Sequence, residues 1–156
     1  MERPKYISVI GASICDEETA SLAEEVGRLV ARTGAVLICG GLGGVMEAAC
    51  RGAKAEGGTT IGILPGVSHS EGNPHLDYSV CTGIGYARNL AVAISGDAVI
   101  AVSGDYGTLS EIALAAKAGR PVVLLESWDI RRDGGIPEGI TVALTPAEAV
   151  SRALVK

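Results

Sequence analysis

The sequence predicts a single doubly wound α/β domain, in which a mostly parallel sheet carries helices on both faces. Short apolar runs rich in Val and Ile alternate with segments of helical periodicity along the 156 residues. Strands that are buried on both faces read as continuous apolar runs of this kind. The repeated strand-helix-strand order implies right-handed crossovers and parallel strands. No Pro- or Ser-rich linker divides the chain, so we expect one domain over residues 1–156.

Continuous apolar runs of five or six residues predict the main strands. These runs are rich in β-branched side chains, which favour strands, and they contain few charges. They occupy residues 6–10, 35–39, 59–64, 98–102 and 121–125. Two weaker runs predict shorter strands near 78–81 and 139–143.

The segments between the strands have helical patterns and end signals. The first helix is expected to end before Gly34, and its buried face consists of Leu22, Ala23, Val26, Leu29 and Val30. Further helices are expected over 44–56, 85–95 and 108–118, each ending at or near a glycine. A last helix begins at Thr145, where Pro146 and Glu148 complete a capping box with Pro at the first helical position.

Charge and hydropathy exclude several classes of protein. The chain has 13 Lys and Arg against 18 Asp and Glu, a formal charge of -5, which argues against nucleic-acid binding through a general basic surface. Asp97 and several glycines interrupt the most apolar region, so no run approaches the ~20 residues of a membrane helix. Residues 1–4 lead straight into a predicted strand without a signal peptide. We therefore expect a cytoplasmic protein with neither a nucleic-acid nor a membrane partner.

Cysteine and histidine spacing gives little sign of a metal. No Cys-x-x-Cys pattern occurs, and the four cysteines are Cys15, Cys39, Cys50 and Cys81. Their apolar or glycine-rich surroundings predict reduced, mostly buried thiols. His69 and His75 bracket a polar loop and form only a weak metal signal. We expect no metal site and no resident cofactor.

Two features of the composition concern packing. Glycine occurs 22 times, about twice the number that the average usage of ~7% would give. These glycines are expected at tight turns and at close approaches of the backbone.

The mean hydropathy is +0.34, and this mild hydrophobicity predicts that some helices are buried between the subunits of a homo-oligomer, a dimer or higher.

Three predicted strand-to-helix junctions are unusually rich in glycine. They are Gly11-Ala12-Ser13, Gly40-Gly41-Leu42-Gly43-Gly44 and Ser103-Gly104-Asp105-Tyr106-Gly107-Thr108. In a doubly wound sheet the ligand crevice lies beyond the C-terminal ends of the strands. Free N–H groups and the positive end of a helix dipole can bind phosphate there without lysine. One such turn is weak evidence, but three at the same edge favour an anion site over glycines that serve packing alone.

Familiar nucleotide motifs are absent. No GxxxxGK[ST] sequence occurs, which excludes a P-loop NTPase. The first junction lacks GxGxxG, and the second strand ends in Cys39-Gly40 where a dinucleotide fold places an acidic residue, so neither NAD nor FAD is expected. No Ser-His-Asp arrangement stands out, because neither histidine lies beside a nucleophile elbow.

Arg88 is a candidate anion clamp. It is the only Lys or Arg between Lys54 and Lys117, and it stands at the start of a mostly apolar helix. The preceding residues 83–87 have the glycine-rich pattern of a helix start that faces the crevice. A guanidinium in such a stretch is either a solvated surface group or a positioned anion ligand, and the pattern favours the second.

Glu111 lies three residues after Thr108, in the first turn of the predicted helix. A carboxylate there suits the helix dipole and can form a capping box with Thr108. A negative charge beside a phosphate site costs affinity unless it has another task, such as holding a sugar hydroxyl or a water. The residues alone leave both roles open.

With these residues assembled, the chain resembles the Rossmann-like proteins that include the Lonely Guy phosphoribohydrolases, the so-called lysine decarboxylase-like proteins and the molybdenum cofactor carrier proteins. The PGGxGTxxE signature of this group appears as SGDYGTLSE at 103–111, and its GGxxGLM element as GGLGGVM at 40–46. The segment GYARN at 85–89 looks most like the carrier-related branch. The resemblance spans nearly the whole chain and implies one Rossmann-like domain.

The resemblance also implies roles for particular residues. Arg88 and Glu111 become the candidate catalytic pair, and phosphate contacts are implied for Gly104, Gly107 and Thr108. The chain departs from the pattern of the group at three positions, with Ser103 for Pro, Asp105 for Gly and Asn89 for Lys. The second and third departures make the site more negative, which weakens the case for cleavage of a monophosphate. The full set expected to bind ligand and phosphate is Gly11, Ala12, Ser13, Gly40, Gly41, Gly44, Val45, Met46, Arg88, Asn89, Ser103, Gly104, Gly107 and Thr108.

Two hypotheses from different classes follow. In the first, the chain holds a phosphorylated nucleotide-like or pterin-like ligand, as a carrier protein would. In the second, it hydrolyses the N-glycosidic bond of a nucleoside 5'-monophosphate through an oxocarbenium-like state, and Glu111 stabilises the cation or activates water. Lysine decarboxylation is not expected, because that chemistry needs pyridoxal phosphate on a lysine and no lysine stands at a suitable junction.

Overall fold

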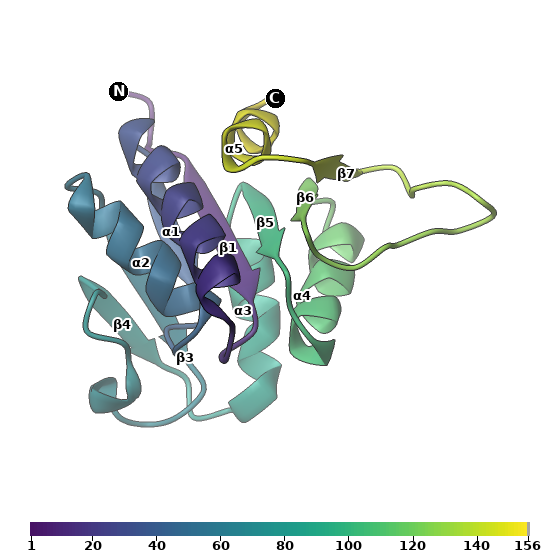
Figure 1. The fold of residues 1–156 in the computed structure, drawn as a ribbon. Helices are drawn as coiled ribbons and strands as arrows, with labels where there is room; N and C mark the ends of the chain where they lie inside the picture. The colour runs from purple at the N-terminus through teal and green to yellow at the C-terminus, as the bar shows by residue number, and fades with distance from the viewer. Residues whose placement is uncertain (156) are drawn as a thin grey trace.

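Seven strands form one sheet in the computed structural model of the protein, which describes residues 1–155 (Figure 1). The order across the sheet is β4-β3-β2-β1-β5-β6-β7, and every neighbouring pair is parallel. The strands are β1 (Tyr6–Gly11), β2 (Val36–Cys39), β3 (Thr60–Leu64), β4 (Tyr78–Cys81), β5 (Ala98–Val102), β6 (Val122–Leu125) and β7 (Ile140–Ala143). The doubly wound α/β prediction is confirmed, and the sheet is parallel throughout.

Five α-helices and two short 3-10 turns connect these strands in the part of the chain that is described. The helices are α1 (Glu17–Arg32), α2 (Val45–Ala55), α3 (Arg88–Ser95), α4 (Tyr106–Lys117) and α5 (Pro146–Leu154), and the turns are η1 (His69–Glu71) and η2 (Gly85–Ala87). Every strand and helix expected from the sequence is present, with ends that move by three residues or fewer. The predicted capping signals of α5 are in place, since the Thr145 hydroxyl accepts the N–H of Glu148 at 3.1 Å.

The helices divide into two layers, one on each face of the sheet (Figure 1). One core joins the sheet to α1, α2 and α5, and the other joins it to α3 and α4. Strand β1 shows how the alternation works: Ile7 and Val9 enter the first core, whereas Ile10 enters the second. Ser8 faces α3, where its buried hydroxyl donates to the Val92 carbonyl at 2.7 Å, so this polar group is satisfied within the core.

The central strands β1 and β5 create the topological switch point of the sheet. They pair in register from Ile7 with Ala98 to Gly11 with Val102, although the chain leaves β1 toward β2 on one side and β5 toward β6 on the other. A crevice is expected beyond the C-terminal ends of two such strands. Gly11 ends β1 here, and a Cβ on it would lie 2.5 Å from both the Val102 carbonyl oxygen and the Val45 side chain.

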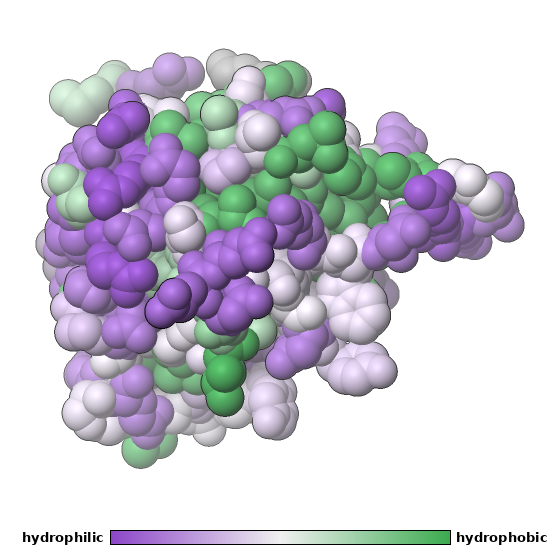
Figure 2. Space-filling view, viewed as in Figure 1, coloured by the Kyte–Doolittle hydropathy of each residue, from purple (hydrophilic) through white to green (hydrophobic). Residues whose placement is uncertain are grey.

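Helices α1 and α2 approach each other closely enough to bring their backbones into contact. A Cβ on Gly27 would lie 1.9 Å from the Ala49 carbonyl oxygen, and a Cβ on Gly52 would lie 1.9 Å from the Glu24 carbonyl oxygen. The outer side of this pair is hydrophilic in Figure 2. Ion pairs there link Glu24 to Arg51 at 3.0 Å. These mid-helix glycines confirm the expectation that part of the glycine content serves close backbone approach.

Two further features lie outside the core. The segment 126–139 between β6 and β7 projects from the body of the molecule as a long loop (Figure 1). Within residues 1–155, none of the helices combines the length and the apolar character that crossing a membrane would require.

Candidate functional site

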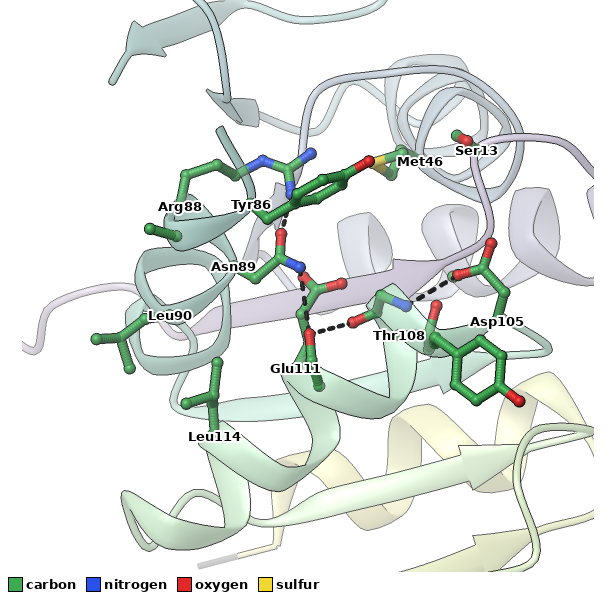
Figure 3. A pocket seen from close by; sticks show the side chains of 15 residues that line it. Ser13, Met46, Tyr86, Arg88, Asn89, Leu90, Asp105, Thr108, Glu111 and Leu114 are labelled. Carbon is green, nitrogen blue, oxygen red and sulfur yellow. Dashed lines mark hydrogen bonds between the residues drawn. The ribbon is translucent and has the colours of Figure 1, made fainter. Parts of the chain in front are cut away.

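A cavity of about 910 Å³ opens at the C-terminal ends of β1 and β5, where the switch point predicts a crevice (Figure 3). Its walls come from the loop after β1, the start of α2, the turn η2, and helices α3 and α4. The residues of the expected set that line it are Gly11, Ser13, Met46, Arg88, Asn89, Gly107, Thr108 and Glu111. The structure therefore brings residues of the first and third glycine-rich junctions, Met46 of the helix that follows the second, and the two charged candidates to one cavity.

The rest of the expected set surrounds this cavity without lining it. These residues are Ala12, Gly40, Gly41, Gly44, Val45, Ser103 and Gly104. The first N–H of α2, that of Val45, already donates to the Ala12 carbonyl at 3.0 Å, so this amide joins two junctions. Ser103 holds its own loop in place, because its carbonyl accepts the Ser127 hydroxyl at 2.6 Å. Ligand contact by these residues stays a prediction.

Arg88 is buried in the wall of the cavity, with 7% of its surface exposed. Its Nη1 donates to the Asn89 side-chain oxygen and its Nη2 to the Gly40 carbonyl at 3.4 Å. A Cβ on Gly40 would lie 2.8 Å from Nη2, so glycine at this position makes room for the guanidinium. Burial lowers the pKa of Arg88, while the nearby Glu111 carboxyl raises it. Arg88 is thus a cation held inside the protein by neutral groups.

Glu111 faces the same cavity from α4 and is also buried. Within residues 1–155 its carboxyl makes neither a hydrogen bond nor an ion pair within 4.0 Å. Burial raises its pKa to about 8, against the opposing effect of Arg88 and with a further increase from Asp105. Near neutral pH the carboxyl is therefore mostly protonated and able to donate a hydrogen bond.

The start of α4 differs from the capping box proposed for Thr108 and Glu111. The helix begins two residues earlier, at Tyr106, and the Asp105 carboxylate caps it by accepting the N–H of Gly107 at 3.1 Å. The physical reason is that Asp105 is as good an N-cap as Thr108 and stands nearer to the end of β5. Glu111 is consequently free of any capping role and faces the cavity instead.

Two buried side-chain atoms lack a hydrogen-bond partner in the described part of the chain, and both belong to residues of this cavity. They are Nε of Arg88 and Oγ1 of Thr108. Buried polar groups in proteins are nearly always satisfied, and leaving one unpaired costs about 1–3 kcal/mol. Two such groups, on α3 and α4 respectively, are places where a water, an ion or a bound molecule could supply the missing partner.

A short chain of polar groups joins the two helices across the site. The Asn89 amide nitrogen lies 3.3 Å from the Ser110 hydroxyl oxygen, and that hydroxyl donates to the Gly107 carbonyl at 2.6 Å (Figure 3). Asn89 thus binds the Arg88 guanidinium through its oxygen and α4 through its nitrogen. The substitution of Asn for Lys, which removes a positive charge, gains a structural explanation here.

The set of ligand-binding residues expected from the sequence omits several residues that line the cavity. Asp105 and Ser110 belong to the α4 start, and Leu90 and Leu114 supply apolar wall. Two tyrosines also line it, as described below. The signal that could have found the tyrosines is the rarity of aromatic residues, which make up 3% of the sequence.

Among the described residues, no cysteine and no histidine lines the cavity. Cys39 and Cys50 are buried, with their sulfur atoms 3.5 Å apart, whereas Cys15 and Cys81 are partly exposed. The Cys50 hydrogen bond lowers the pKa of Cys39. No three His, Cys, Asp or Glu side chains within residues 1–155 are grouped as metal ligands would be.

Known proteins share both the sequence and the fold. An uncharacterized protein of Archaeoglobus fulgidus is 48% identical over 145 residues, covering 93% of this chain and 91% of the relative. The cytokinin riboside 5'-monophosphate phosphoribohydrolase of Mycobacterium tuberculosis is 32% identical over 127 residues, or 75% of this chain and 67% of the relative. The solved structure of the molybdenum cofactor binding protein from Rippkaea orientalis superposes with a TM-score of 0.86 at 34% identity, covering 97% of this chain and 96% of that one.

A family model completes the comparison. The model described as the SLOG cluster4 family matches residues 4–150, which include every strand and every cavity-lining residue. Together with the parallel sheet and the glycine-rich junctions, this match confirms the resemblance drawn from the motifs: the chain belongs to the SLOG cluster4 family.

Proposed function

We propose that this protein binds a small phosphorylated ligand of nucleotide-like or pterin-like chemistry in the cavity at the switch point, and holds it intact as a carrier does. The observation that carries this proposal is the pair of unpartnered buried groups, Arg88 Nε and Thr108 Oγ1, in one cavity. Both can donate a hydrogen bond to an anionic oxygen. The likeness to the molybdenum cofactor binding protein from Rippkaea orientalis supports the same class of function.

The charges in the cavity suit a phosphate group. Arg88 stays cationic, and Glu111 is mostly neutral because its pKa is raised to about 8. The N-terminus of α4 adds the positive end of its dipole, although the Asp105 carboxylate already occupies the Gly107 N–H. The phosphate contacts therefore fall to Arg88 and Thr108, with Glu111 available to donate to a ligand hydroxyl or ring atom.

A second candidate function is hydrolysis of the N-glycosidic bond of a nucleoside 5'-monophosphate. The observation that favours it is the buried, protonatable Glu111, which resembles the raised-pKa general acids of glycoside hydrolysis. Glu111 would give its proton to the departing base, and the attacking water would return a proton to the Glu111 carboxylate as its oxygen bonds to the sugar carbon, releasing the free base and ribose 5-phosphate. The phosphoribohydrolase of Mycobacterium tuberculosis is a relative with that activity in its name.

One experiment separates the two candidates. Native mass spectrometry of the freshly purified protein detects any ligand that copurifies, and incubation with a panel of nucleoside 5'-monophosphates follows, with chromatographic detection of free base. An intact bound ligand without base release supports the carrier. Base release that disappears in Glu111→Gln supports the hydrolase. Purification without ligand, and no thermal shift with any nucleotide or pterin, contradicts both.

Loss of the guanidinium is expected to weaken phosphate binding strongly. Arg88→Gln removes the only cation among the described residues that line the cavity, and hydrogen bonds to charged groups contribute about 1.5–3 kcal/mol each. We expect at least a hundredfold weaker binding of AMP in isothermal titration calorimetry. Arg131→Gln is the matched control, because Arg131 is exposed on the projecting loop and pairs only with Asp129 in the described residues. Equal AMP affinity in the wild-type protein and in Arg88→Gln would show that Arg88 does not bind the phosphate.

A further inference from the structure

We infer that Tyr86 and Tyr106 form an aromatic subsite that stacks against a planar heteroaromatic ring of the ligand. The inference deepens the proposed function and rests on it. Both tyrosines line the cavity, yet both are largely exposed to solvent. The exposed fraction of the residue is 90% for Tyr86 and 80% for Tyr106. Large aromatic side chains this exposed at the edge of a cavity are typical of binding surfaces.

The placement of the aromatic residues in this chain is selective. The sequence contains one Trp, four Tyr and no Phe. Two of these five aromatic side chains line the cavity, and a third, Trp128, contacts Tyr106. A core that uses Ala, Val, Ile and Leu almost exclusively has no packing need for aromatic residues at this edge. The cluster therefore points to a ligand rather than to fold stability.

The Tyr106 ring packs against the Trp128 ring. Its ring lies 5.6 Å from the Trp128 ring, centroid to centroid, at a tilt of 44°. Trp128 is itself anchored, because its Nε1 donates to the Asp105 carbonyl at 3.0 Å. Tyr106 is also the first residue of α4, so its backbone is fixed by the helix that carries Thr108 and Glu111. A ring held in this way loses little conformational entropy when a ligand stacks on it.

Tyr86 is presented by a different element, the turn η2. Gly85 adopts the left-handed backbone conformation at φ 60°, which glycine reaches without strain, and Arg88 begins α3 just beyond the turn. One short turn thus buries Arg88 in the wall and leaves Tyr86 exposed beside the cavity. Figure 3 shows the Tyr86 ring among the lining side chains, which include Met46.

The two ends of the site differ in chemistry. Arg88 and Thr108 are 7% and 1% exposed, whereas the tyrosine rings are almost fully exposed, so the anion-binding groups lie deep and the rings lie at the rim. Leu90 and Leu114 add apolar surface to the wall. A ligand that carries a phosphate at one end and a flat heteroaromatic ring at the other satisfies both ends at once. A phosphorylated sugar that lacks a heteroaromatic ring can contact only the buried groups, Arg88 and Thr108.

The test compares two probes that share a phosphate and differ in the ring. Binding of AMP and of ribose 5-phosphate is measured by calorimetry on the wild-type protein and on Tyr86→Ala, Tyr106→Ala and the double variant. We expect AMP to bind the wild-type protein at least tenfold more tightly than ribose 5-phosphate. The double variant is expected to lose about tenfold in AMP affinity and to bind ribose 5-phosphate within twofold of the wild-type value.

Control variants separate stacking from structural damage. Tyr86→Phe and Tyr106→Phe keep the rings and are expected to retain AMP affinity within twofold. Tyr78→Ala removes an exposed tyrosine of β4 that does not line the cavity, and it is expected to change neither affinity. If both probes bind the wild-type protein equally and the Ala variants change neither, the aromatic subsite is wrong while the phosphate site stands. If neither probe binds, the subsite and the proposed nucleotide-like ligand both fail.

Discussion

At pH 9 the Glu111→Gln variant is expected to be more stable than the wild-type protein by about 5 kcal/mol. Glu111 is 6% exposed, and burial raises the pKa of its carboxyl to about 8 from an ordinary value of 4.5. Between these two values the folded protein keeps a proton on Glu111 that the unfolded chain releases. The contribution of Glu111 to the unfolding free energy therefore falls as pH rises from about 4.5 to about 8 and then levels.

Glutamine resembles the protonated acid and cannot ionise, so the variant lacks this part of the pH dependence. Urea unfolding at pH 5, 7 and 9 is the measurement, with Glu138→Gln as control because Glu138 is exposed on the projecting loop. The variant and the wild-type protein are expected to differ least at pH 5 and most at pH 9. A difference in unfolding free energy that does not change with pH would show that Glu111 titrates normally.

Gly52→Ala is expected to destabilise the fold by about 3 kcal/mol or more. Helix propensity alone predicts the opposite, since Ala stabilises a helix interior by ~1 kcal/mol relative to Gly. The steric clash of the new Cβ outweighs the gain in helix propensity, so the net change in unfolding free energy is destabilising. The new Cβ would lie 1.9 Å from the Glu24 carbonyl oxygen, which is backbone and cannot move aside as a side chain would. Helices α1 and α2 would have to separate along their whole contact.

The matched control is Gly135→Ala on the projecting loop, where a Cβ would meet nothing within 4 Å. Chemical denaturation of both variants measures the difference, and the control is expected to stay within about 0.5 kcal/mol of the wild-type protein. Gly27→Ala introduces the reciprocal clash against the Ala49 carbonyl and is expected to behave like Gly52→Ala. Wild-type stability in Gly52→Ala would mean that the two backbones are less close than described.

The strands could be predicted because a strand that is buried on both faces is a continuous apolar run in the sequence. The apolar runs at 6–10 and 98–102 became β1 and β5, the central pair of the sheet, with ends shifted by one residue or none. Three glycine-rich junctions then had to meet at one edge, since all strands are parallel. Arg88 and Glu111 follow the C-terminal ends of two parallel strands, β4 and β5, and both line the cavity.

Other features depend on tertiary contacts that no local pattern encodes. Asp105 and Thr108 are both residue types that cap helices well. Asp105 is the N-cap of α4 because it lies nearer to the end of β5. Gly27 and Gly52 carry no turn signal, because their role is set by the helix that crosses them. The outward direction of Tyr86 follows from the turn η2, which replaces the first residues of the predicted helix over 85–95.

The cavity lies across the boundary between the two helical layers. Met46 reaches it from α2, which packs in the core with α1 and α5, whereas Arg88 and Glu111 reach it from α3 and α4 in the other core. A molecule bound there touches both layers at once, at the point where only the ends of β1 and β5 separate them. Local opening of either layer would break its contacts, so occupancy is expected to slow amide hydrogen exchange on both faces of the sheet and to make their unfolding more cooperative.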